Sequence, residues 1–110
     1  NDRFQTIHDL EGLKQATTSA AQNGQWTVVD FYADWCQPCR RLAPILESLS
    51  EKVGDRAKIV KVNVETEVDL AEAYRIRSLP TIAFFKDGEV VSQSSGLMTL
   101  AALEAKLAEL

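Results

Sequence analysis

Residues 30–40 read DFYADWCQPCR, and this stretch decides the fold because it joins a strand pattern to a helix pattern and contains both cysteines. An apolar, strand-like run leads into it over residues 26–33. A helical pattern follows it, with apolar residues at spacings of three and four on one helix face. Those residues are Cys39, Leu42, Leu46, Leu49 and Val53. The pattern therefore places Cys36 where a buried strand ends and a helix begins.

The place of Cys36 at the start of a helix has chemical consequences. The first turn of a helix presents unpaired backbone N–H groups and the positive end of the helix dipole. A thiolate there is stabilised relative to a thiol, so we expect the pKa of Cys36 to fall and the residue to attack at neutral pH. Cys39 lies one turn further on the same side, close enough to close a short disulfide.

The Cys-x-x-Cys pair leaves four interpretations open. It can be a dithiol/disulfide redox site, half of a zinc site, an inert local disulfide, or two buried thiols without a role. Zinc needs about four ligands, and His8 is the one further soft ligand on offer, so the sequence predicts no metal site. The junction of strand and helix favours redox chemistry, because it lowers a thiol pKa where solvent can reach.

Length and composition predict one globular domain over residues 1–110. The chain is 45% hydrophobic and 25% charged, as is usual for globular proteins. Its net charge of −4 argues against a nucleic-acid partner or an anionic membrane surface, which favour a basic excess. No apolar run approaches the ~20 residues that span a bilayer, so we expect no membrane insertion.

The remaining patterns predict the other elements of an α/β fold. A short edge strand is expected at residues 4–6, then a helix with Ile7, Leu10 and Leu13 buried, ending near residues 23–24. Further strands are expected at 57–64, 81–86 and 89–95, a short helix at 68–74, and a last helix with Leu100, Leu103, Leu107 and Leu110 buried. Asp87-Gly88 predicts a hairpin between the last two strands. Strands linked by helices run parallel, so the sequence predicts a mixed central sheet with helices on both faces.

Asp30 is unusual because it interrupts an apolar strand that we expect at the centre of the sheet. Burial raises the pKa of a carboxyl group, which would suit a proton acceptor. Lys61, in the middle of the neighbouring strand, is the counter-charge that the sequence offers. Two interpretations stay open here: a functional proton acceptor, or a structural buried pair of Asp30 and Lys61.

Trp35 and Pro80 each allow two interpretations as well. Trp35 can be a recognition surface or a core aromatic, and its position at a turn beside Cys36 predicts partial exposure. Pro80 can be functional or a plain loop proline, and an X-Pro bond taken alone is cis only about one time in twenty.

Several motifs stand in the order and spacing found in one family, so the chain resembles thioredoxins from about residue 4 to residue 110. The motifs are VVDF at 28–31, ADWCQPCR at 33–40, APIL at 43–46, KVNV at 61–64, IRSLPT at 76–81, FKDGE at 85–89, and Gly96. The resemblance implies a thioredoxin fold and a protein disulfide reductase that works by thiol–disulfide exchange.

The resemblance also implies roles for individual residues. Cys36 corresponds to the exposed nucleophile that attacks a substrate disulfide, and Cys39 to the buried thiol that then attacks the mixed disulfide and releases the reduced substrate. Asp30 corresponds to the buried carboxylate that helps to take the proton of Cys39, with Lys61 as its neighbour. Pro80 corresponds to a cis-proline facing the disulfide. The implied docking surface comprises Trp35, Gln37, Pro38, Leu79, whose backbone would meet an extended substrate, Gly96 and Leu97.

The resemblance implies partners and a compartment too. The substrates would be disulfide-containing proteins, and a thioredoxin-reductase-type donor would restore the dithiol, with the Cys36–Cys39 disulfide as redox group and no added cofactor. We expect a monomer. The cytoplasm is favoured, and a periplasmic or organellar location stays open because a targeting segment removed before Asn1 would be invisible.

Two departures from the family pattern keep alternatives open. Gln37 stands where the usual motif has Gly, and Tyr32 where Trp is common. Pro38 is retained, which favours a reducing member, and we expect the bulk of Gln37 to alter substrate access more than reduction potential. The alternatives are an exported or membrane-linked thioredoxin-like electron donor, and a non-catalytic binding module that uses the thioredoxin groove.

Overall fold

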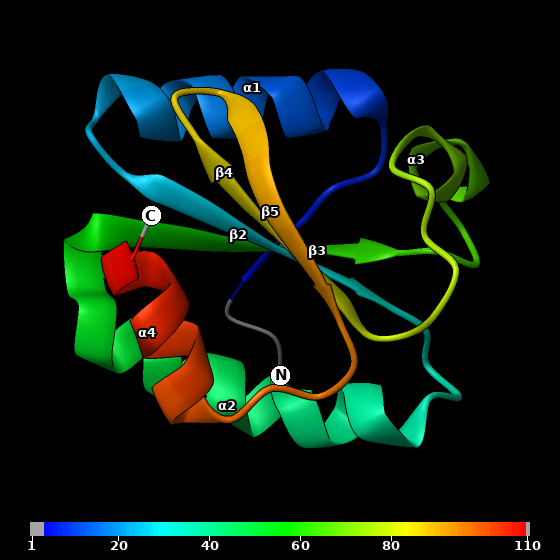
Figure 1. The fold of residues 1–110 in the computed structure, drawn as a ribbon. Helices are drawn as coiled ribbons and strands as arrows, with labels where there is room; N and C mark the ends of the chain where they lie inside the picture. The colour runs from blue at the N-terminus through cyan, green and yellow to red at the C-terminus, as the bar shows by residue number, and fades with distance from the viewer. Residues whose placement is uncertain (1–3, 110) are drawn as a thin grey trace.

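The computed structural model describes residues 4–109 as a central sheet between two layers of helices (Figure 1). Helices α1 (Leu10–Gln22) and α3 (Val68–Ala73) cover one face, and α2 (Gln37–Val53) and α4 (Leu100–Glu109) cover the other. The described strands are β1 (Gln5–Thr6), β2 (Trp26–Tyr32), β3 (Ala57–Asn63), β4 (Thr81–Lys86) and β5 (Glu89–Ser95). Their order is β1-β3-β2-β4-β5, in which β1, β3 and β2 run parallel and β4 and β5 pair antiparallel. The mixed sheet with helices on both faces is therefore confirmed.

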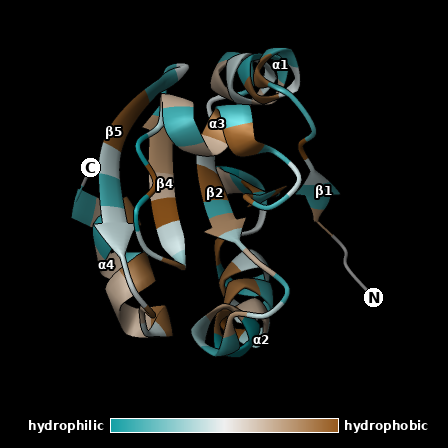
Figure 2. Cartoon of the chain, turned by 90° about the vertical axis from the view of Figure 1, so that its right-hand side faces the viewer, coloured by the Kyte–Doolittle hydropathy of each residue, from teal (hydrophilic) through white to brown (hydrophobic). Residues whose placement is uncertain are grey.

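The central strands are apolar on both sides because both of their faces are covered (Figure 2). Successive residues of a strand point to opposite faces. Val28 packs with Leu46 of α2, whereas Val29 packs with Leu13 of α1. Asp30 is on the same side of β2 as Val28, so its carboxyl group points towards the layer of α2.

The hairpin between β4 and β5 forms at Asp87-Gly88, as predicted. Both residues have positive φ, 56° for Asp87 and 82° for Gly88, the backbone that a tight two-residue hairpin requires. The turn places β5 at the edge of the sheet, beside β4.

The first helix differs from its prediction. We expected Leu10 to be buried, but it is 40% exposed, and the buried side chains of α1 are Leu13, Ala16, Thr17 and Ala20. The Asp9 carboxylate accepts the Gly12 N–H at 2.7 Å and caps α1, so Leu10 is the first residue of the helix and lies at the end of the buried face, one turn before Leu13. Ile7 is buried as expected, although it precedes the helix.

Two further details complete the fold. A 3-10 turn, η1 (Gly54–Arg56), follows α2 and had no signal in the sequence. Of the leucines expected to be buried in α4, Leu103 is fully buried, whereas Leu100 and Leu107 pack against the same core but are only half-buried. Leu110 lies outside the described residues. Among residues 4–109, no helix has the length and apolar character needed to cross a membrane.

Candidate active site

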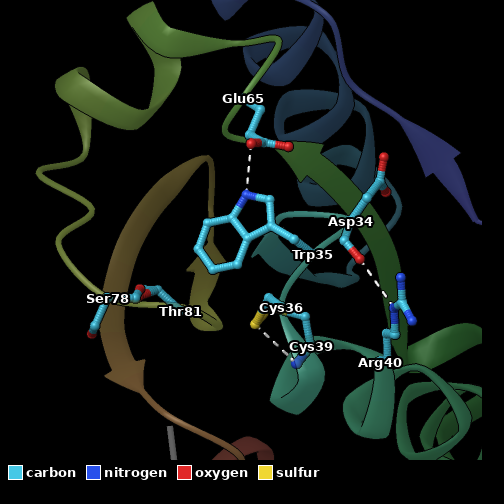
Figure 3. The surroundings of a disulfide bond; sticks show 8 residues. All are labelled: Asp34, Trp35, Cys36, Cys39, Arg40, Glu65, Ser78 and Thr81. Atoms are coloured by element: carbon cyan, nitrogen blue, oxygen red, sulfur yellow. Dashed lines mark hydrogen bonds between the residues drawn. A yellow bond between two sulfur atoms is a disulfide. The ribbon is translucent and has the colours of Figure 1, made fainter.

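Cys36 occupies the junction between β2 and α2, where the sequence predicted it. Its backbone is extended, and it is the N-cap of α2, with Pro38 in the first turn. Its Sγ atom accepts the backbone N–H of Cys39 at 3.2 Å (Figure 3). The two cysteines form a disulfide across Cα atoms that are 5.2 Å apart. The helix terminus therefore directs an N–H group at the sulfur of Cys36.

The burial of the two cysteines corrects one expectation. We expected an exposed Cys36 and a buried Cys39, but in the disulfide form they are 4% and 5% exposed. The cause is tertiary packing, because Tyr32, Val64 and Leu79 pack against the small cluster that the two cysteines form with Ala33. Burial therefore does not distinguish the two cysteines; their surroundings do.

Cys36 borders an open, mostly apolar depression, which we call the groove. Its volume is about 470 Å³. Its apolar members besides Cys36 are Trp35, Pro38, Val64, Ala71, Ile76 and Leu79, and its polar members are Gln37, Arg77 and Ser78. Of the predicted docking residues, the structure thus brings Trp35, Gln37, Pro38 and Leu79 together around Cys36.

Cys39 borders a different cavity, which we call the Asp30 pocket. Asp30, Lys61 and Tyr32 line it together with Cys39. Asp30 is 1% exposed and lies opposite Lys61 in the register of β2 and β3, as the sequence suggested. The Lys61 ammonium lies over the Tyr32 ring, 4.4 Å from its centroid. The only buried acid beside the disulfide among residues 4–109 therefore lies on the Cys39 side.

The segment before β4 carries the proline singled out by the sequence. The Leu79–Pro80 peptide bond is cis, as the resemblance implies, and Pro80 is buried. The Thr81 hydroxyl donates to the Ser78 carbonyl at 2.7 Å, and the Gly96 N–H donates to the Pro80 carbonyl at 2.8 Å. These two hydrogen bonds fix the backbone that places Leu79 against the disulfide.

Gly96 and Leu97 are the predicted docking residues that the structure leaves outside the groove. Gly96 has a φ of 94°, a conformation that favours glycine, and reaches the site through its hydrogen bond to Pro80. Leu97 is 45% exposed beside it. Neither residue lines the groove.

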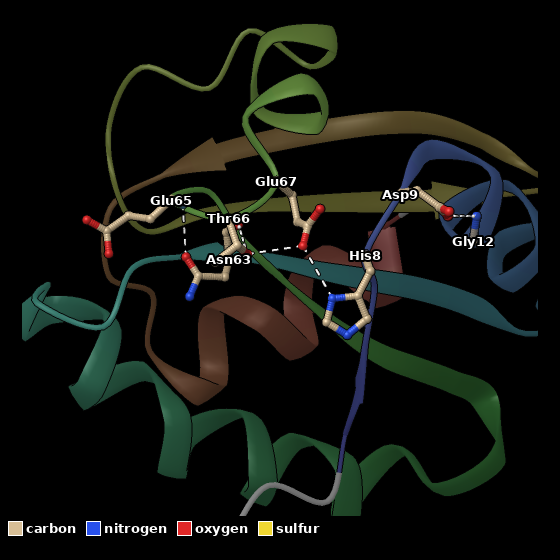
Figure 4. Close-up of polar contacts among 7 residues, drawn as sticks. All are labelled: His8, Asp9, Gly12, Asn63, Glu65, Thr66 and Glu67. Atoms are coloured by element: carbon tan, nitrogen blue, oxygen red, sulfur yellow. Dashed lines mark hydrogen bonds and ion pairs between the residues drawn. The ribbon is translucent and has the colours of Figure 1, made fainter.

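Trp35 is 65% exposed, so the predicted exposure is confirmed. Its indole Nε1 donates to the Glu65 carboxylate at 2.6 Å (Figure 3). Glu65 is held in turn, because its N–H donates to Asn63 Oδ1 at 2.9 Å (Figure 4). Sequence reasoning missed Glu65, although one signal was present. Glu65 stands two residues after the end of β3, and the ends of the parallel neighbours β2 and β3 meet at one edge of the sheet.

His8 has no part in this site. It is exposed, precedes α1, and its Nδ1 lies 3.2 Å from Glu67 Oε2 (Figure 4). In the part of the chain that the structure describes, no group of three or more His, Cys, Asp or Glu side chains could hold a metal ion.

A cysteine pair at the N-terminus of a helix after a central strand, beside a cis-proline and a buried acid, defines a dithiol/disulfide redox protein. Known proteins agree. The family model described as Thioredoxin matches residues 13–109. Thioredoxin C-2 of Corynebacterium nephridii is 49% identical over 81 residues, which cover 74% of this chain and 71% of that protein. Thioredoxin of Bacillus subtilis is 44% identical over 77 residues, 70% of this chain and 74% of that protein.

Solved structures agree as well. Fasciola hepatica thioredoxin superposes with a TM-score of 0.87 at 29% identity, covering 96% of this chain and 98% of that chain. A mutant thioredoxin from Halobacterium salinarum gives 0.85 at 34% identity, covering 96% and 88%. The chain belongs to the thioredoxin family. It has the thioredoxin fold and is a thiol–disulfide oxidoreductase with protein disulfide reductase activity, which acts on disulfide-bonded proteins and receives electrons from a reductase.

Proposed function

We propose that Cys36 attacks the substrate disulfide and that Cys39 resolves the mixed disulfide. The observation that carries this assignment is the different surroundings of two equally buried cysteines. Cys36 borders the groove, where a substrate can approach, whereas Cys39 borders the Asp30 pocket. Trp35, Gln37, Pro38 and Leu79 would contact the substrate, and Pro80, Gly96 and Leu97 would shape the neighbouring surface.

In the first step, the Cys36 thiolate attacks one sulfur of the substrate disulfide. A bond forms between Cys36 Sγ and that sulfur, the substrate S–S bond breaks, and the second substrate sulfur leaves as a thiolate. The Cys39 N–H and the N-terminus of α2, which face Cys36 Sγ in the disulfide form, would stabilise the thiolate before attack.

In the second step, Cys39 attacks Cys36 Sγ. Asp30 would take the proton of the Cys39 thiol, directly or through a water molecule in the pocket they share. We propose that burial raises the pKa of the Asp30 carboxyl group towards the range in which it can accept a proton, while Lys61 stabilises the charged form. The substrate leaves as a thiolate, and the Cys36–Cys39 disulfide forms again.

The wider assignments follow the family. We propose that the chain acts as a single domain and a monomer, in the cytoplasm, with a thioredoxin-reductase-type donor. The net charge of −4 and the family membership support a partner that is a protein and not a nucleic acid.

The test compares Cys36→Ser with Cys39→Ser, using insulin as substrate and dithiothreitol as electron donor. Cys36→Ser should lose reduction and form no mixed disulfide. Cys39→Ser should also lose turnover. When the reduced Cys39→Ser protein is freed of dithiothreitol and then mixed with insulin, it should accumulate a covalent complex with the substrate. A Cys36→Ser protein that reduced insulin at the wild-type rate would contradict the assignment. A native function that survived Cys36→Ser would indicate the non-catalytic binding module.

A further inference from the structure

The groove beside Cys36 carries one charged side chain, Arg77. Every other member of its lining is apolar or neutral, and no Asp or Glu contributes to it. Arg77 is exposed, in the segment that leads to Leu79. A cation at the rim of an apolar groove is a recognition element for an anionic group that enters with apolar neighbours.

The charge of Arg77 is not used inside the protein. Within residues 4–109, Arg77 forms no ion pair, in contrast to Lys52, which pairs with Glu104, and Lys106, which pairs with Glu109. The Glu65 carboxylate accepts the hydrogen bond of the Trp35 indole, which lines the groove, and does not pair with Arg77. Arg40 lies on the other side of the disulfide, where it lines the Asp30 pocket and donates Nε to the Asp34 carbonyl at 3.0 Å (Figure 3).

The net charge of the chain limits how Arg77 can act. With a net charge of −4, the protein as a whole repels acidic partners. Screening confines that repulsion and any attraction to about 8 Å at physiological ionic strength. Arg77 can therefore select an acidic residue only within a few residues of the attacked cysteine, and not an acidic protein in general.

We propose that Arg77 is a specificity residue, which favours substrate disulfides with an Asp or Glu within about three residues of the attacked cysteine. This inference rests on the proposed function, since it requires that the groove receive the substrate of Cys36. The contact adds no chemical step. It holds the substrate while Cys36 Sγ forms the new S–S bond and the leaving thiolate departs with the electron pair of the broken one.

The formation of the mixed disulfide between Cys36 and a substrate, which we call capture, can be measured by itself in the Cys39→Ser variant, because this variant cannot resolve the mixed disulfide. The probes are peptides with one cysteine and one Glu and no other charged side chain. The cysteine is activated as a 2-pyridyl disulfide, whose uncharged leaving group is followed by absorbance. Near peptides carry Glu two residues before or after the cysteine and Gln six residues away. Far peptides have Glu and Gln exchanged, so that composition and net charge are identical.

The protein should capture a near peptide about twofold to fivefold faster than its far counterpart, the size expected of an exposed ion pair. Arg77→Gln should abolish the preference, Arg77→Lys should retain part of it, and Arg77→Glu should reverse it. Arg75→Gln is the matched control, because Arg75 is also exposed in this segment but does not line the groove, and it should keep the full preference. Salt should reduce the preference.

Two results would overturn the inference and leave the proposed function intact: equal capture of near and far peptides, or a preference that persists in Arg77→Gln. Capture of neither peptide would instead overturn the proposed function, and the inference with it.

Discussion

The groove and the Asp30 pocket lie on two sides of one disulfide and differ in almost every property except the burial of their cysteine. The groove is open, mostly apolar and contains no acid, while the pocket holds a carboxyl group that is 1% exposed and a lysine opposite it. Cys36 and Cys39 are themselves buried to the same extent. In the function that we propose, the neighbours of each sulfur, and not its exposure, therefore assign attack to Cys36 and resolution to Cys39.

The largest effect is expected from a substitution in the Asp30 pocket. Asp30→Asn should slow release of substrate from the mixed disulfide by at least about tenfold at neutral pH, because positioned proton transfer contributes typically 10²–10⁴-fold. Capture by Cys36 should change by less than about twofold, since Asp30 does not line the groove. The two rates can be measured separately by stopped flow, with Asp55→Asn, an exposed acid in η1, as control.

The rate of substrate release should also depend on pH in a defined direction. Asp30 accepts a proton only when it is deprotonated, so the wild-type release rate should rise with pH as the carboxyl group ionises, and Asp30→Asn should flatten that rise. A release rate with the same pH profile in both proteins would return Asp30 to a structural role.

A smaller effect is expected on the groove side. Glu65→Ala removes the acceptor of the Trp35 indole and should slow capture about twofold to fivefold, because a mobile Trp35 orders the substrate less well. Release should not change. The shift of the Trp35 indole N–H resonance reports the lost hydrogen bond, and Glu72→Ala, an exposed acid of α3, is the matched control. An unchanged rate of capture in Glu65→Ala, together with a shifted indole resonance, would show that substrate binding does not depend on the hydrogen bond between Trp35 and Glu65.

A still smaller effect is expected from a substitution of Gln37 in the groove. Gln37 is exposed, so Gln37→Gly should admit a folded substrate about twofold faster while leaving small peptides unaffected. The reduction potential should move by less than about 10 mV, roughly a twofold change in the equilibrium constant. A larger shift of potential would mean that Gln37 tunes thiolate stability and not access.

The smallest effect is expected at Tyr74, which contacts neither side of the disulfide. Tyr74 packs between Phe31 and Phe85, with ring centroids 5.9 and 5.8 Å away, and burial raises the pKa of its phenol above the ordinary value of about 10. The folded state holds this proton more tightly than the unfolded chain, so its contribution to stability is complete below pH ~10 and declines as pH rises further.

Tyr74→Phe should therefore lose less stability than the wild type between about pH 8 and about pH 11. Urea unfolding at the two pH values measures the difference. Capture and release near pH 7 should be unchanged, and a change in either would show that the core on this face of the sheet does influence the site.

Much of the fold could be predicted because its signals are local. The alternation of Val28 and Val29 between the two helix layers, and the positive φ of Asp87 and Gly88, follow from residue type and spacing. The position of Cys36 at the start of a helix follows from the pattern of apolar residues, which is strand-like before Cys36 and helical after it. The exposure of Leu10 could not be predicted in this way, because its spacing from Leu13 fits the buried face although the residue lies at the very start of the helix, directly after the Asp9 cap.

The site was only partly predictable because its walls come from distant segments. The covering of Cys36 depends on Leu79, and the orientation of Trp35 depends on Glu65, each far away in the sequence. Composition and periodicity carry no information on which distant loops meet. The residues of the motif were therefore identified, while the equal burial of the cysteines and the anchor of Trp35 required the structure.

The alkylation of the reduced protein by iodoacetamide as a function of pH tests the central claim most directly. Mass spectrometry can assign the label to Cys36 or Cys39. Cys36 should react first, with a midpoint below the pKa of about 8.5 for an ordinary thiol, and Cys39 should react later and at higher pH. Equal rates at the two cysteines, or faster reaction at Cys39, would contradict the assignment of attack to the groove side.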